Sequence, residues 1–131
     1  MSQLPEPLAS LHAGLLPVFE DVRIEWAVPQ HGGVGGKRVL ELGPLDGAHT
    51  YMLERFDSAE VVAVEANTHA YLRCLIVKEL LEIRRARFLL GDFVEYLRAT
   101  RDKFDVWAWF KREEKHLYKL KERMSNSGQG R

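Results

Sequence analysis

The sequence is short of the residues that build disulfides, metal sites and membrane spans. Cys74 is the only cysteine, so an intrachain disulfide and a cysteine-based zinc site are both excluded. The five histidines show no metal-ligand spacing, and we expect them to have packing or surface roles. No apolar run approaches the roughly 18 residues that cross a bilayer, and no secretory signal pattern opens the chain. These absences predict a cytoplasmic protein with no metal and no membrane contact.

An excess of charge is also lacking. Lysine and arginine number 19, as do aspartate and glutamate, so net charge does not indicate a nucleic-acid partner. The charges are uneven, however, because residues 111–131 hold seven basic and three acidic side chains. This tail could contact RNA or an acidic protein, but a solvated helix is the commoner explanation of such a run. Nucleic-acid binding therefore remains open without support.

The length of 131 residues predicts one domain with one modest core. We divide it into a leader over residues 1–36, a core over 37–110 and a basic C-terminal helix with a disordered tail over 111–131. In the leader, residues 1–7 look like a frayed arm, and a glycine-rich loop closes it. Between them we expect one broken helix or two short ones, with apolar stripes at Leu8, Leu11 and Leu15 and at Val18, Val22 and Trp26.

Strand and helix patterns alternate through the core, which is typical of parallel βαβ units. We predict strands at 38–42, 60–64, 86–90 and 104–110, with helices starting near residues 46, 67 and 92. In the first helix, Ala48, Met52 and Phe56 should face inward; in the second, the inward stripe should be Leu72, Leu75, Ile76, Leu80 and Ile83. The predicted fold is a three-layer α/β sandwich with a mainly parallel sheet in the order 3-2-1-4.

Acidic residues recur at matching places in this alternation. Glu41 lies within the first strand, Glu65 ends the second and Asp92 follows the third. Since the carboxyl ends of parallel strands meet at one edge of a sheet, three carboxylates should converge on one crevice. A ligand with a cationic end, a diol and an exocyclic amine would suit them. Glu65 and Asp92, taken singly, also have a purely structural explanation, because each could cap the helix that follows it.

Three short motifs carry a resemblance to a known family. The segments are Glu41-Leu-Gly43-Pro-Leu-Asp46-Gly47, then Val-Val-Ala-Val-Glu65-Ala-Asn, then Leu-Leu-Gly91-Asp92-Phe93. They resemble the acidic and glycine signatures of the class I S-adenosylmethionine-dependent methyltransferases, which have a Rossmann-like fold. The resemblance covers about residues 37–107.

The resemblance implies S-adenosylmethionine as the cofactor and a set of binding residues. Glycines of the turn would let the backbone approach the methionine part, while acidic groups would lie near its amino group, the ribose hydroxyls and the adenine amine. In this sequence the implied residues are Glu41, Gly43, Pro44, Asp46, Gly47, Glu65, Ala66, Asp92 and Phe93. His49 and Thr50 are weaker candidates, and no catalytic base is indicated.

The sequence departs from the family in two respects. Leu45 occupies a turn position where glycine is common, and Pro44 removes a backbone donor. Such domains normally have seven strands, whereas this chain predicts about four, so the domain looks C-terminally shortened. A NAD-binding Rossmann protein is the nearest competing fold, but it would favour G-x-G-x-x-G and give no special place to Asp92.

Two functions follow from the resemblance. The first is methyl transfer from S-adenosylmethionine to an unidentified acceptor. The second is a truncated, non-catalytic module that binds the cofactor or a protein. In the second case the open sheet edge could pair with another chain and give an oligomer.

Overall fold

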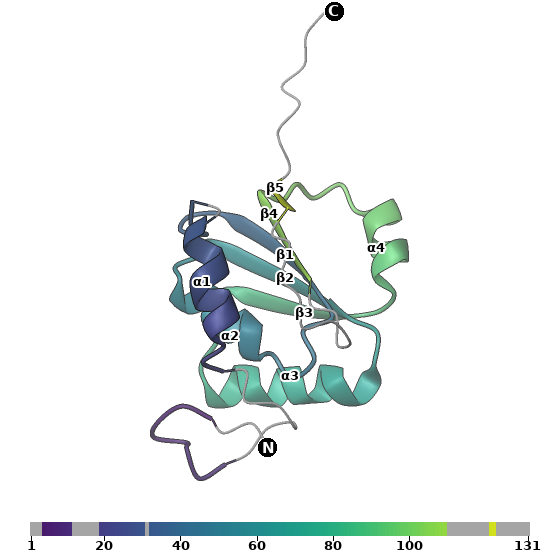
Figure 1. The fold of residues 1–131 in the computed structure, drawn as a ribbon. Coiled ribbons are helices and arrows are strands. Elements are labelled where there is room, and N and C mark those ends of the chain that lie inside the picture. Colours follow the sequence, from purple (N-terminus) through teal and green to yellow (C-terminus); the bar gives the residue numbers. More distant parts are fainter. Residues whose placement is uncertain (1–3, 12–18, 31, 110–120, 123–131) are drawn as a thin grey trace, which may run out of the picture.

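A computed structural model describes residues 4–11, 19–30, 32–109 and 121–122 (Figure 1). Helices and strands alternate along the core, as the sequence predicts. In chain order the elements are α1 (Val22–Gln30), β1 (Arg38–Leu42), α2 (Ala48–Arg55), β2 (Glu60–Glu65), α3 (Thr68–Leu80), β3 (Ala86–Leu90), α4 (Phe93–Ala99), β4 (Val106–Trp109) and β5 (Lys121–Glu122). In the described part of the chain, no helix has both the length and the hydrophobicity that a membrane span requires.

The strands form one sheet in the order β3-β2-β1-β4-β5. β1 to β4 are parallel, which confirms the predicted order 3-2-1-4, and the two-residue β5 adds an antiparallel pairing on β4. In the register, Leu42 lies opposite Val64 and Trp109, and Glu65 lies opposite Leu90. The strands therefore end side by side, and the loops that follow β1, β2 and β3 share one edge.

Helices cover both faces of the sheet, which gives the predicted three layers (Figure 1). One face packs against α1, α2 and α3 through a large core cluster that includes Val39, Val61 and Phe88. The other face packs against α4 through a smaller cluster that includes Leu40 and Val62. Because alternate residues of a strand point to opposite faces and both faces are covered, the central residues of β1 and β2 are apolar in succession and buried, as at residues 39–40 and 61–64.

The inward face of α2 is as predicted, but those of α1 and α3 are not. Ala48 and Met52 are buried and Phe56 packs against the core. In α1 the core side is Ile24, Ala27 and Val28, while Val22 and Trp26 are 70% and 55% exposed. In α3 the core side is Ala70, Cys74 and Val77, and the predicted stripe is exposed apart from Ile83.

The reason for the error in α3 is its close approach to the turn after β1. The Cα of Cys74 is 3.6 Å from the position that a β-carbon on Gly47 would take. Only small side chains permit such an approach, so the helix turns its smaller residues toward the sheet and leaves its leucines outside. Hydrophobicity alone favoured the opposite face, because it takes no account of side-chain volume.

The two ends of the chain also differ from the prediction. Residues 4–11 form turns rather than a helix, and Leu4 is buried in the main core although it lies in the predicted frayed arm. The rest of the first predicted leader stripe, at 12–18, lies outside the described residues. Of the predicted C-terminal helix and tail at 111–131, only Lys121–Glu122 are described, and they form a strand instead of helix.

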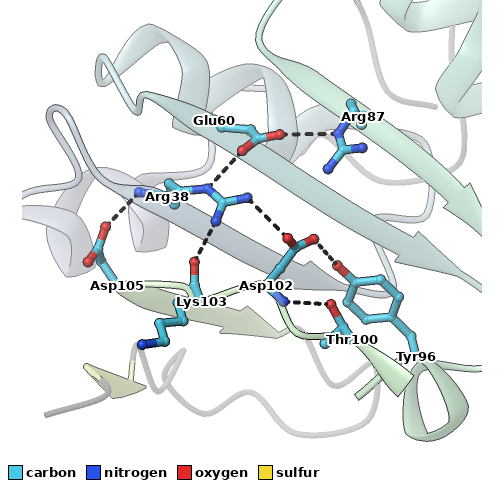
Figure 2. A network of polar contacts seen from close by, with 8 residues as sticks. All are labelled: Arg38, Glu60, Arg87, Tyr96, Thr100, Asp102, Lys103 and Asp105. Atoms are coloured by element: carbon cyan, nitrogen blue, oxygen red, sulfur yellow. Dashed lines mark hydrogen bonds and ion pairs between the residues drawn. The ribbon is translucent and has the colours of Figure 1, made fainter. Parts of the chain in front are cut away.

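A network of charged groups fixes the strands at their amino ends (Figure 2). The guanidinium of Arg38 donates to Glu60 at 2.8 Å and to the Lys103 carbonyl at 2.9 Å, and its backbone N–H donates to Asp105. Glu60 also accepts from Arg87 at 3.1 Å. The hydrogen bond and charge of Glu60 raise the pKa of Arg38 above its ordinary value. This edge joins β1, β2, β3 and the start of β4.

Candidate functional site

The turn after β1 is built from residues in the left-handed conformation. Gly43, Leu45 and Gly47 have φ values of 69°, 57° and 80°. A β-carbon on Gly43 would meet nothing within 4 Å, so this glycine borders open space. A β-carbon on Gly47 would instead lie in ordinary van der Waals contact with the Phe88 ring at 3.4 Å, so this position is packed from inside and its φ of 80° is what favours glycine. The two predicted glycines therefore have different structural roles.

Backbone hydrogen bonds bring the three predicted motifs together at one edge. The N–H of Gly43 donates to the Val64 carbonyl at 2.9 Å, and the N–H of Gly91 donates to the Glu65 carbonyl at 2.9 Å. Like Gly43, Gly91 has nothing within 4 Å of its potential β-carbon. The carboxyl edge of the sheet is therefore open above both glycines, with the end of β2 between them.

Glu41 and Asp46 are buried, at 4% and 5% exposure. Glu41 accepts a hydrogen bond from the Thr50 hydroxyl in the first turn of α2. Burial raises the pKa of both carboxyl groups, and the Thr50 bond only partly offsets it for Glu41. Asp46 was expected to begin the helix, but Gly47 is the N-cap and no side chain caps it.

Glu65 is 6% exposed, and its carboxylate accepts hydrogen bonds from two backbone N–H groups. Its Oε2 accepts from Leu45 at 3.1 Å, and its Oε1 accepts from Asn67 at 2.9 Å. An ionised carboxylate offers about four acceptor positions, so each oxygen keeps one for a ligand. Asn67 caps α3 by accepting from the Ala70 N–H, as the sequence predicts.

Asp92 lies on the surface beside an apolar group. Its Oδ1 accepts from Val94 at 2.7 Å and from Glu95 at 3.1 Å, so it is the N-cap of α4. Around it Leu90, Phe93 and Val94 are 51%, 44% and 40% exposed. Of the other predicted residues, Ala66 is exposed and Pro44 is buried. The cap leaves Oδ2 of Asp92 without a described partner.

A buried pair of Asp21 and His49 joins the leader to α2, and the sequence did not reveal it. The Oδ2 of Asp21 lies 3.0 Å from Nε2 of His49, and Arg23 donates to both oxygens of Asp21. Burial acts to raise the pKa of Asp21, but the hydrogen bonds from His49 and Arg23 outweigh it and hold that pKa well below its ordinary value. An aspartate just before a helix is a recognisable cap signal, but its long-range partner is not.

A hollow of about 310 Å³ lies at the other end of α2, away from the carboxyl edge. None of the predicted ligand-binding residues borders it. Its lining is Phe19, Glu20, Glu25, Met52, Arg55 and Phe56. The candidate site is therefore the open edge above Gly43 and Gly91, where the three sequence motifs meet.

Comparisons with known proteins show which proteins share this fold. No family model matches the chain, and no curated protein sequence matches it significantly. Solved structures do match. A putative RNA methyltransferase from Pyrococcus horikoshii has a TM-score of 0.54 at 23% identity, over 66% of this chain and 41% of its own. A putative methyltransferase from Escherichia coli has a TM-score of 0.60 at 16% identity, over 70% and 54%.

The N-terminal domain of EvdMO1, solved with S-adenosylhomocysteine (SAH) bound, matches with a TM-score of 0.57 at 26% identity, over 67% of this chain and 37% of its own. The chain has the Rossmann-like fold of the S-adenosylmethionine-dependent methyltransferases. It spans about half the length of these relatives or less. In this methyltransferase fold, other neighbours are also crystallised with SAH.

Proposed function

We propose that the chain binds S-adenosylmethionine at the carboxyl edge of its sheet and transfers its methyl group to an acceptor. The single observation that carries the proposal is the set of buried carboxylates at an open edge. Glu41, Asp46 and Glu65 are each at most 6% exposed, and the described residues place no arginine or lysine hydrogen bond on any of them. Burial raises the pKa of the Asp46 carboxyl group and outweighs the charge of Arg73, which favours the ionised form. Buried acidic groups without a hydrogen-bonded cationic partner are costly, so a cationic ligand would stabilise them.

The residues present fit the parts of this cofactor. Gly43, which borders open space, would face the methionine part, while the buried Pro44 and Gly47 would shape the turn, with Glu41 and Asp46 near the amino group. The free acceptor positions of Glu65 suit the two ribose hydroxyls, and the free oxygen of Asp92 suits the adenine amine. Ala66 and the exposed ring of Phe93 would contact the adenine.

The cofactor, when bound, would supply a sulfonium methyl group that is already activated for displacement by a nucleophile. The chain would contribute mainly proximity and orientation, since in-line transfer needs the acceptor held close to the methyl. No acceptor class is assigned, because the described residues nominate no group that recognises one.

A second function, a binding module without catalysis, is favoured by the β4 edge. Beyond β4 the described residues supply only the two-residue β5, which pairs with Val106 and Trp107. A strand edge that the described residues pair only in part can pair with another chain and so produce an oligomer. In this alternative the cofactor would still bind, but no acceptor would be methylated.

Calorimetric titration with SAH tests the proposal, with NAD⁺ as the control ligand for the competing Rossmann fold. We expect one SAH bound per chain, a rise in the melting temperature, and neither effect with NAD⁺. If millimolar SAH gives neither heat nor a thermal shift, the proposals of cofactor binding and of methyl transfer are both wrong. SAH binding without consumption of S-adenosylmethionine in a cell extract would favour the binding module.

A further inference from the structure

Leu45 occupies a backbone conformation in the candidate turn that residues other than glycine seldom adopt. Its φ of 57° lies in the left-handed region between two glycines of the same hand. A leucine stays there only when the surroundings fix it more strongly than the conformation disfavours it. The contacts of Leu45 should therefore show what holds the turn.

Both peptide groups of Leu45 are held by side chains from other elements. Its N–H donates to Oε2 of Glu65 at 3.1 Å, at the end of β2. Its carbonyl accepts from the thiol of Cys74 at 3.2 Å, in the middle of α3. The turn after β1 is thus fixed from two sides, and one anchor is the carboxylate proposed to bind the ribose.

Cys74 is suited to this contact by its burial and its protonation. It is 0% exposed, and its Cα lies beneath Gly47 in the same turn. Burial raises the pKa of the Cys74 thiol, and the nearby carboxyl groups of Glu41, Glu65 and Asp46 raise it further. The sulfur therefore keeps its proton at neutral pH and remains a donor.

We propose that Cys74 is a positioning residue, which together with Glu65 presets the Leu45 turn for the cofactor. This inference rests on the proposed function. It explains how the turn tolerates leucine where the family often has glycine. It also gives Glu65 two tasks, because the carboxylate proposed for the ribose also fixes the turn proposed for the methionine part.

The test compares Cys74→Ala, which removes the donor, with Cys74→Ser, which keeps one. Val77→Ala is the matched control, because Val77 lies on the same buried face of α3 without a hydrogen bond to the turn. Two quantities are measured: hydrogen exchange of the Leu45 amide in the ligand-free protein, and SAH affinity by calorimetry. Melting temperatures show how much each variant is destabilised.

In Cys74→Ala we expect the Leu45 amide to exchange faster and SAH to bind more weakly, each by about two- to fivefold, the scale of a weak hydrogen bond. Cys74→Ser should stay within about twofold of the natural protein, as a hydroxyl also donates. Val77→Ala should lower the melting temperature and change neither quantity.

Unchanged exchange in Cys74→Ala, or equal effects of alanine and serine, would overturn the positioning role. Exchange is read without ligand, so a failure of SAH binding in the natural protein would count against the proposed function alone. If exchange changes but SAH affinity does not, the thiol holds the turn without presetting it for the cofactor, and the inference is also wrong.

Discussion

The two edges of the sheet both carry acidic side chains but hold them in different ways. At the amino edge, Glu60 accepts from the guanidinium groups of Arg38 and Arg87 and is partly exposed (Figure 2). At the carboxyl edge, Glu41 and Glu65 are buried and accept only from a hydroxyl and from backbone N–H groups. Within the described residues, the first arrangement includes hydrogen-bonded guanidinium groups, whereas Glu41 and Glu65 receive no hydrogen bond from arginine or lysine. The contrast supports the proposal that the carboxyl edge is the binding site, while the amino edge holds the strands together.

The largest expected effect comes from removing one carboxylate at each edge. Glu65→Ala should weaken SAH binding by about 30- to 150-fold, since charge-assisted hydrogen bonds are worth about 2–3 kcal/mol. Glu60→Ala, the matched variant at the amino edge, should leave the affinity within about twofold. Calorimetric titration measures both, and equal losses in the two variants would remove the distinction between the edges.

Two glycines provide the next comparison. Gly43 at the carboxyl edge and Gly36 just before β1 have φ values of 69° and 68°, and both have open space around a potential β-carbon. Alanine should lower the free energy of unfolding by about 1–2 kcal/mol at either position, because the left-handed conformation disfavours it. Only Gly43→Ala should also weaken SAH binding, by about tenfold, since its methyl would enter the ligand space. Denaturant unfolding and calorimetry separate the two effects. Unchanged SAH affinity in Gly43→Ala would mean that the open space is not the ligand site.

Burial raises the pKa of Glu41, so the folded state holds its proton more tightly than the unfolded state does. The free energy of unfolding of the ligand-free protein should therefore fall as pH rises from about 4.5 through the folded pKa. Asp21 has the opposite effect, because its pKa is lowered: its contribution to the free energy of unfolding is lost as the pH falls below about 4.

Glu41→Gln keeps an acceptor for Thr50 and removes this titration. The variant should show a flatter pH profile and should be more stable than the natural protein at pH 8, because it no longer buries this carboxylate. Some slope should remain, because Asp46 also has a raised pKa. Denaturant unfolding from pH 4 to pH 8 measures this pH dependence in both proteins. If the free energy of unfolding depends on pH in the same way in both proteins, ionisation of Glu41 does not destabilise the folded state.

The smallest effect is expected at the amino edge. Arg87 is 56% exposed on its side chain, and its ion pair with Glu60 is screened by water. Arg87→Ala should cost about 0.5 kcal/mol or less, and the cost should disappear at high salt. SAH affinity should not change. A loss above about 1 kcal/mol in denaturant unfolding would show that the network is more than a surface contact.

Much of the fold followed from local pattern. The strands at 38–42 and 86–90 have the predicted bounds, because apolar runs between turn residues mark buried parallel strands. Their alternation with helices predicted parallel strands, and parallel strands place Glu41, Glu65 and Asp92 at one edge, while the sheet order was predicted together with the family resemblance. The predicted cap at Asn67 holds as well, since capping depends on residues three apart.

The features that the sequence did not predict depend on contacts between residues far apart in the chain. The outward face of α3 carries Leu72 and Ile76 because the turn at Gly47 admits only small side chains beneath it. The contact of Asp21 with His49 spans 28 residues, and that of Cys74 with Leu45 spans 29. No periodicity in the sequence encodes either contact.

By itself the sequence determined the order of elements and the edge at which the acidic residues gather, because strand spacing and turn residues are local properties. Only the tertiary structure decided which carboxylates are buried, which helix face meets the sheet, and how Leu45 is held in its turn. Those outcomes depend on volume and on partners far apart in the chain, and they become fixed only when α3 packs against the turn after β1.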